Sequence, residues 1–511
     1  MRYFLLFFLP FIHIVSVQSQ NLKTKPFLQY SDFGAKGDGK TDDLDAIIAT
    51  HAFANEHQLP VKADEGYTYY IGGEDRTAII QTNTDFGTAQ FIIDDTQLEN
   101  RQAPVFVVQS SLQSFPIEGL ATLKRNQEKI DIALSQSCLI TVTNSNVKHY
   151  IRFGLNQNNG SPQTDIFVVD QAGNVDMNAP IIWDFDTITS AKVLPIDSTT
   201  LTITGGRFTT IANQAESKYD YHHRNLTIQR SNVIVDGLEH RIIGEGNQGA
   251  PYSGFITIKD CAYVTVKNAL LTGHKTYQTI GAAGKPVSMG SYDLSVGRSL
   301  NVSFINCRQT NNIHDLTYWG ILGSNYCKNL LYDNCTLSRF DAHKGVANAT
   351  IRNSTLGHMG INAIGSGTLT VENTTVRGRG FIKLRTDYGS TWQGEFIIRN
   401  CTFIPEGNLS FPALISGYYS GQHDFGYTCY MPERILLESV HIDDTRFSDN
   451  YQYPVVFSDF NSEMTDEMYE ERFPYVRTQE VVLDEVTTDS GKAIRLSSNL
   501  VFFEGVEVRR K

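Results

Sequence analysis

Short runs of alternating apolar and polar residues recur from residue 263 onward, and each run closes on an asparagine. Such alternation is typical of a strand with one buried face, and Asn favours the turn that follows. The intervals between these asparagines run from 19 to 38 residues, which indicates a solenoid with shared strands and variable loops. They are Asn268, Asn306, Asn334, Asn353, Asn373 and Asn400. We expect their side chains to stack and to satisfy buried backbone groups.

A second set of strands follows these runs and begins with Gly and an apolar residue. The pairs are Gly320-Ile321, Gly345-Val346, Gly360-Ile361 and Gly380-Phe381. Two strand sets that recur in every coil predict parallel stacking, at about 4.8 Å per coil. Cys307, Cys335 and Cys401 each follow a closing Asn, so we expect them to be stacked, buried free thiols.

An amphipathic stretch near the N-terminus predicts a helix that covers the open end of the solenoid. It places Leu44, Ile47, Ile48 and Ala52 on one face. Thr41 is the expected N-cap of this helix.

The chain divides into four expected parts. Residues 1–19 have the layout of a secretory signal, because Arg2 precedes a short apolar run and a small residue, Ser19. Residues 20–100 form the first coils and the N-terminal cap, and 101–225, which lack the repeat, form an antiparallel β-rich elaboration. Residues 226–511 form the parallel β-helix with the active-site face. Secretion to the periplasm or the extracellular space follows from the signal.

Composition narrows the choice of partner. The chain has 43 Lys and Arg against 55 Asp and Glu and has no sustained basic stripe, so nucleic acid is a poor partner. No later run is apolar enough to span a membrane. The pattern does not determine the oligomeric state.

The segment DFGAKGDGKTDD, residues 32–43, resembles the opening of the pectate-lyase-like and polygalacturonase-like β-helix superfamily. With the later Asn runs, the resemblance covers residues 30–60 and about 226–510. It implies an all-β, right-handed parallel β-helix that acts on an extracellular polysaccharide. The superfamily includes lyases, hydrolases, epimerases and phage tailspikes, so it implies the fold more strongly than the chemistry.

Alignment on the Gly-apolar pairs predicts a column of Tyr318, His343 and His358 on one face of the stacked coils. In the next strand, period-two geometry directs Lys383 and Arg385 outward. Arginine supplies planar, paired donors that suit carboxylates or sulfates. We therefore expect these five residues to be catalytic. Residues expected to bind substrate are Arg377, Arg379, Lys344, Trp319, Asp315, Asp341, His274, Tyr277 and Asn362.

The polygalacturonase-like hydrolases carry a Gly-His-Gly and an Arg-Ile-Lys motif, which residues 356–365 and 381–385 resemble. Their paired aspartates are missing here, since Asp315 and Asp341 stand in similar coils without the doublets. This difference favours β-elimination at a uronic acid, with His358 or His343 as base, Lys383 and Arg385 neutralising the carboxylate, and Tyr318 protonating the leaving oxygen.

The predicted substrate is an acidic polysaccharide, with a lean to a glycosaminoglycan such as chondroitin or hyaluronan. Two other functions stay open: an inverting hydrolase that uses Asp315 and Asp341, and a glycan-binding solenoid without catalysis. The sequence identifies no certain cofactor, and Asp293, Asp315 and Asp341 leave calcium open as an alternative. No zinc pattern is present.

Overall fold

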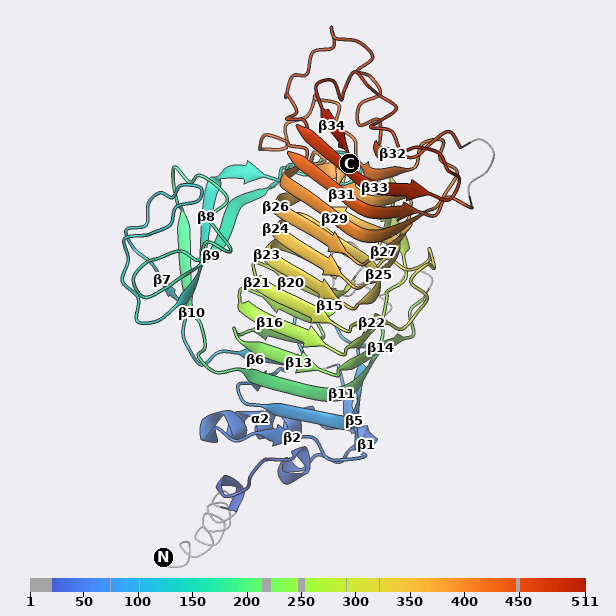
Figure 1. Cartoon of the computed structure of the whole chain (residues 1–511). Coiled ribbons are helices and arrows are strands. Elements are labelled where there is room, and N and C mark those ends of the chain that lie inside the picture. Colours follow the sequence, from blue (N-terminus) through green and yellow to red (C-terminus); the bar gives the residue numbers. More distant parts are fainter. Residues whose placement is uncertain are drawn as a thin grey trace, which may run out of the picture.

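The computed structural model describes residues 21–73, 75–100, 102–213, 222–246, 253–290, 292–320, 322–446 and 451–511. Within them, 28 strands form one sheet whose pairings are all parallel, wound into stacked coils (Figure 1). The right-handed parallel β-helix predicted from the sequence is confirmed. The expected signal, residues 1–19, lies outside the described residues. Among the described helices, none is long and apolar enough to cross a membrane.

Each coil has three faces, which the chain visits in the same order. The first face contains β2 (Val61–Lys62), β13 (Val233–Asp236), β16 (Ala262–Lys267), β21 (Leu300–Ile305), β26 (Gly365–Glu372) and β34 (Glu507–Arg510). The second contains β1 (Asp38–Asp42), β3 (Thr68–Ile71), β14 (Glu239–Ile243), β17 (Leu270–Leu271), β22 (Arg308–Gln309) and β27 (Thr375–Gly378). The third contains β4 (Ala78–Ile80), β6 (Phe106–Gln109), β12 (Leu226–Gln229), β15 (Ser253–Lys259), β20 (Tyr292–Gly297), β28 (Gly380–Leu384), β30 (Ala413–Ser416) and β32 (Val455–Phe457).

Longer strands turn a corner and belong to more than one face. These are β5 (Thr84–Asp94), β11 (Leu201–Ile211), β23 (Leu322–Asp333), β24 (Thr336–Arg352), β25 (Thr355–Ala363), β29 (Trp392–Pro405), β31 (Arg434–Ile442) and β33 (Glu480–Thr488). The apolar residues of all three faces point inward and form one continuous core. All seven cysteines are free and buried, as expected for Cys307, Cys335 and Cys401.

The predicted asparagine ladder exists, but it lies on the surface. The side chains of Asn268, Asn306 and Asn334 donate along the stack, with an Asn334 Nδ2 to Asn306 Oδ1 distance of 2.7 Å. All six closing asparagines are exposed and have φ between 47° and 55°. The expectation that they satisfy buried backbone groups is therefore wrong. Asn is selected here because it tolerates the left-handed turn between the first and second faces.

A second ladder, which sequence reasoning missed, marks the corner before the first face. Asn301, Asn329 and Asn348 also have positive φ. Their amides connect in sequence, at 2.9 Å from Asn329 to Asn301 and 3.1 Å from Asn348 to Asn329. Two corners of each coil are thus stabilised by stacked amides.

We expect Asn353→Ala to lower the free energy of unfolding by about 1 kcal/mol, because alanine disfavours the left-handed conformation. Asn353→Gly should be nearly neutral, since glycine adopts positive φ freely. Urea unfolding of both variants tests this. Equal losses for Ala and Gly would show that the side-chain hydrogen bonds, not the backbone conformation, select Asn353.

The N-terminal cap is confirmed with corrections. Helix α2 (Leu44–His57) buries Leu44 and Ile47 against the first coil, while Ala52 is exposed. Its N-cap is Asp43, not Thr41, which lies in β1. The Asp43 carboxylate accepts hydrogen bonds from the backbone amides of Lys36 and Gly37, and so closes the preceding loop.

The antiparallel elaboration is a four-stranded sheet in the order β7-β10-β8-β9, which lies beside the stacked coils (Figure 1). Its strands are β7 (Phe115–Pro116), β8 (Cys138–His149), β9 (Ser161–Val169) and β10 (Ser190–Pro195). It is narrower than the expected 101–225, because β6 and β11 pair with strands of the helix. The remaining elements are the hairpin β18 (Tyr277–Ile280) and β19 (Pro286–Met289) and two 3₁₀ turns, η1 (Tyr30–Phe33) and η2 (Thr386–Tyr388).

Candidate functional site

The strand register does not form the expected column of Tyr318, His343 and His358. Phe340 pairs with Ile361, and Ile361 pairs with Ile382. Val346 pairs with Gly365, so Gly345 is not level with Gly360. The alignment on Gly-apolar pairs was wrong because successive loops differ in length.

A different column occupies three successive coils of the third face. Asp341 pairs with Asn362, which pairs with Lys383. Ile382 and Leu384 are fully buried, while Lys383 is exposed and Arg385 partly exposed, so the predicted period-two arrangement is confirmed. The outward side chains of these strands form the floor of a cleft.

This main cleft has a volume of about 640 Å³. Its walls come from the third face, from β19 and from a strap, residues 150–160, that joins β8 to β9 in the elaboration. The predicted site residues that line it are Trp319, His343, Asn362, Lys383 and Arg385. The lining residues that sequence reasoning missed include Arg152, Asn325, Arg339, Asp387 and Tyr418.

Alternating charges run along the wall of the main cleft. Asp341 is 0% exposed and binds Arg339 Nη2 at 2.7 Å and Arg385 Nη1 at 3.1 Å. Arg385 Nη2 lies 3.0 Å from Asp387 Oδ2, which Arg152 Nη2 contacts at 2.8 Å. Three guanidiniums therefore enclose two carboxylates, and the wall keeps a net positive charge.

Each guanidinium is also held by an aromatic ring. Arg339 lies 5.2 Å from the Trp319 ring centroid, and Arg385 lies 5.6 Å from that of Tyr388. Although burial disfavours its charge, Asp341 and Asp387 raise the pKa of Arg385, so this cation is permanent. The Nε and Nη1 atoms of Arg339 have no hydrogen-bond partner among the described residues. Both atoms are buried below the cleft surface, where the guanidinium lies against the rings of Trp319 and Tyr292.

His343 has the properties of a base. Its Nδ1 lies 2.9 Å from Asn325 Oδ1, an acceptor, which assigns the proton to Nδ1 and the lone pair to Nε2. Burial, with the nearby charges of Arg385 and Lys344, lowers its pKa well below the usual value. The imidazole is therefore neutral at neutral pH.

Lys383 is the cation of the site that has no carboxylate partner among the described residues. Partial desolvation in the cleft, and after it the charge of Arg385, lower the pKa of Lys383. Lys344, in contrast, turns to the elaboration, where its Nζ donates to Ser161 Oγ at 3.3 Å.

A side cleft of about 570 Å³ adjoins the main cleft and shares Met359, Asn362 and Lys383 with it. His358, Arg377 and Arg379 line it, as does Arg446. His358 Nδ1 lies 3.1 Å from the carbonyl oxygen of Ile313, so its Nε2 is unprotonated when the ring is neutral. Arg377 is paired with Glu406 at 2.5 Å.

Several predicted residues lie away from both clefts. Tyr318 forms an isolated antiparallel β-bridge with Lys275 through the backbone. Asp315 accepts hydrogen bonds from the backbone and hydroxyl of Thr317, within the same turn. Tyr277 is buried in β18. Asp341 lies beneath the floor rather than in contact with the cleft space.

His274 and Asp293 belong to a buried cluster instead of a substrate site. His274 contacts Asp293 at 3.4 Å and Glu245 at 3.3 Å, and His240 contacts Asp293 at 2.8 Å. Asp293, Asp315 and Asp341, the three residues named above as the calcium alternative, thus each interact with a different set of partners. In the described part of the chain, no group of three or more His, Cys, Asp or Glu is arranged to hold a metal ion.

The buried His274 predicts a pH dependence of stability. Although burial opposes its charge, hydrogen bonds to Asp293 and Glu245 raise its pKa to about 9. A folded-state pKa above the unfolded value gives stability that is complete below about pH 6.5 and is lost as pH rises toward 9. We expect a loss on the order of 3 kcal/mol between these limits. Melting curves at pH 6.5 and 8.5 should differ for the wild type and agree more closely for His274→Gln.

The missed residues carried little sequence signal. Asp387 follows Arg385 by two positions and could have been included. Arg152 comes from the elaboration, 235 residues before its partner Asp387, and no repeat aligns it with the site.

Comparisons with known proteins support the architecture. No protein-family model matches the sequence. A capsule KL64-specific depolymerase of a Klebsiella phage is 29% identical in an alignment of 102 residues, and the match covers 18% of this chain and 10% of that protein. The matched stretch therefore spans a tenth of the length of this curated relative.

Two solved structures resemble the chain along most of its length. The tailspike protein gp49 of Pseudomonas phage LKA1 is 14% identical, with 94% of this chain and 84% of that chain covered and a TM-score of 0.52. The tailspike gp61 of Pseudomonas phage phi297 is 12% identical, with 91% and 80% covered and a TM-score of 0.51. At these identities the likeness shows a shared fold.

Proposed function

We propose that this chain, which has the right-handed parallel β-helix fold of the pectate-lyase-like and polygalacturonase-like superfamily, binds an acidic polysaccharide in the main cleft and cleaves it by β-elimination. The observation that carries the proposal is a neutral imidazole, His343, beside an excess of fixed cations. Removal of the C5 proton of a uronic acid needs both a base and a cation that stabilises the enolate-like charge.

Each step is assigned to a residue of the main cleft. His343 Nε2 takes the C5 proton, the C4–O bond breaks and a C4–C5 double bond forms. Lys383 and Arg385 neutralise the carboxylate. The leaving oxygen takes a proton from Tyr418, a 38% exposed phenol at the cleft, which replaces Tyr318 as the candidate acid.

The side cleft extends the binding surface. Because the two clefts share Asn362 and Lys383, a polymer bound in one continues into the other. Arg379 and Arg446, which have no carboxylate partner among the described residues, would bind an acidic group on a further sugar. The substrate class we favour is thus a polymer with repeated uronic acids, which includes glycosaminoglycans and bacterial capsular polysaccharides. The similarity to a capsule depolymerase supports a capsular polysaccharide as the kind of polymer, without bearing on its uronic acid content.

The test is incubation with a panel of uronic-acid polymers, including chondroitin, hyaluronan, pectate and capsular polysaccharide, while absorbance near 232 nm is followed. The expected result is a rise from the new double bond on at least one polymer. New reducing ends without absorbance would instead indicate the hydrolase. Tight binding of a polymer without any product would indicate a glycan-binding module.

A further inference from the structure

The strap that carries Arg152 is fixed to the coils on both sides of the main cleft. The amide of Ile151 donates to the Phe425 carbonyl at 3.1 Å, and that of Phe153 donates to the Asp387 carbonyl at 3.0 Å. Further along, the carbonyl of Leu155 accepts from Ala283, between β18 and β19, at 3.0 Å. The strap is therefore part of the cleft wall.

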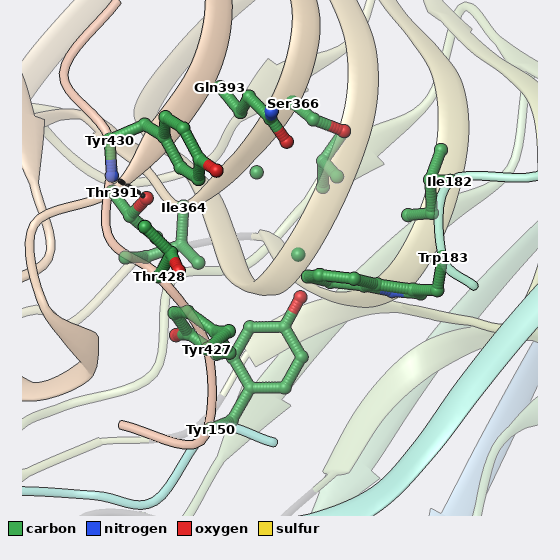
Figure 2. A pocket seen from close by; sticks show the side chains of 13 residues that line it. Tyr150, Ile182, Trp183, Ile364, Ser366, Thr391, Gln393, Tyr427, Thr428 and Tyr430 are labelled. Carbon is green, nitrogen blue, oxygen red and sulfur yellow. Dashed lines mark hydrogen bonds between the residues drawn. The ribbon is translucent and has the colours of Figure 1, made fainter. Parts of the chain in front are cut away.

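The elaboration behind the strap is also firmly docked. A fully buried ion pair joins Lys328 of β23 to Asp165 of β9 at 2.7 Å. Tyr150 packs against Tyr427 with a centroid distance of 5.2 Å. Figure 2 shows Tyr150, Trp183 and Tyr427 around a cavity of about 40 Å³ at this joint. Side chains of both parts thus pack together at this joint.

Arg152 is the side chain by which the elaboration reaches the catalytic groups. Its Nε and Nη2 lie 2.9 and 2.8 Å from Asp387 Oδ2. Asp387 in turn receives Arg385 Nε at 3.2 Å and Nη2 at 3.0 Å. Without Arg152, the Asp387 carboxylate would be held by Arg385 alone, and one of the two anchors of Arg385 would be less firmly fixed.

Arg152 also acts on the environment of the base. It lies 5.4 Å from the centroid of the Tyr388 ring, whose edge-on partner is His343 at 5.6 Å. Its charge is one of those that keep the pKa of His343 low. A single residue of the elaboration is therefore connected to the cation through Asp387 and to the base through Tyr388.

We propose that Arg152 is a positioning residue of the active site, and that the antiparallel elaboration completes the site by holding Arg385 through Asp387. This inference rests on the proposed function for its kinetic consequences, but not for the geometry. Arg152 contacts no reacting atom; it orients the cation that does.

The test compares Arg152→Gln, Arg152→Lys and the wild type. Arg152→Gln should lower kcat by up to about 100-fold with a smaller change in KM, because the cation is misplaced rather than removed. It should also move the acid limb of the kcat/KM profile to higher pH, since the pKa of His343 rises when a neighbouring cation is lost. Arg152→Lys should restore the acid limb but not kcat, because an ammonium cannot make the paired contact.

The matched control is Arg125→Gln. Arg125 also joins the elaboration to the coils, with its Nη1 2.6 Å from Gln393 Oε1, but it lies outside both clefts. It should leave kcat and the pH profile unchanged. If Arg125→Gln and Arg152→Gln lower kcat equally without moving the profile, Arg152 only docks the elaboration and the inference is overturned.

A second readout does not depend on activity. NMR titration of ¹³C-labelled histidine, with His343→Gln to assign the signal, should give a higher His343 midpoint in Arg152→Gln than in the wild type. If the wild type cleaves no polymer but the His343 midpoint is still higher in Arg152→Gln, the lyase proposal is wrong and the positioning role of Arg152 stands. An unchanged His343 midpoint in folded Arg152→Gln, or a wild-type kcat in Arg152→Lys, would refute the positioning itself.

Discussion

Replacing His343 by Ala is expected to lower kcat for β-elimination by about 10²- to 10⁴-fold, the usual contribution of a positioned general base. The residue suits this role because its Nδ1 faces Asn325 Oδ1, which leaves the Nε2 lone pair available. Its lowered pKa keeps the ring neutral, so activity should persist below the pH at which an ordinary histidine protonates. The measurement is the initial rate at 232 nm, with circular dichroism to show that the fold is intact.

Added imidazole provides the control for this variant. It should restore part of the activity of His343→Ala, because the lost group leaves space for a small base. His358→Ala is the matched comparison, since its Nε2 is also unprotonated but lies in the side cleft. We expect its main effect to be on KM for long substrates. If His358→Ala is inactive and His343→Ala is active, the base has been assigned to the wrong cleft.

The fold could be predicted from the sequence because its signals are local. The Asn that closes each run is selected by the conformation of its own turn, and the segment 32–43 is selected by the structure of the N-terminal cap alone. The outward direction of Lys383 and Arg385 was equally local, since it depends on alternation within one strand. These features do not require knowledge of how coils align.

The site could be predicted only in part because it depends on register between coils. β24 places Arg339 and Phe340 level with Gly360 and Ile361, so Gly345 could not serve as a marker. Loop length, which varies between coils, determines this register and has no signature in a single sequence. Arg152 comes from an inserted sheet that does not repeat. Its contact with Asp387 forms only in the tertiary structure, and no periodic pattern in the sequence indicates it.

Substitution of Asp341 distinguishes the lyase mechanism from the hydrolase mechanism, because the two predict different effects on the stability of the protein as well as on its activity. Its carboxylate is fully buried and receives Arg339, Arg385 and the Tyr292 hydroxyl, the last at 3.1 Å. Removing one partner of a buried ion pair leaves uncompensated charge, at a cost of about 3–5 kcal/mol. We therefore expect Asp341→Ala to lower the free energy of unfolding by that amount, measured by urea unfolding, and to lower the melting temperature by roughly 3–5 °C.

Asp315→Ala is the matched control, because Asp315 is a solvated turn residue whose contacts are with Thr317. It should keep both the melting temperature and the rate at 232 nm. A hydrolase that used these two carboxylates would behave in the opposite way: Asp315→Ala and the milder Asp341→Asn would both be inactive while remaining as stable as the wild type. The two mechanisms differ here because a catalytic carboxylate must be able to exchange a proton with substrate or water. A carboxylate enclosed by two guanidiniums and a phenol has no such access, and its contribution is to hold Arg339 and Arg385 where the substrate's charge can meet them.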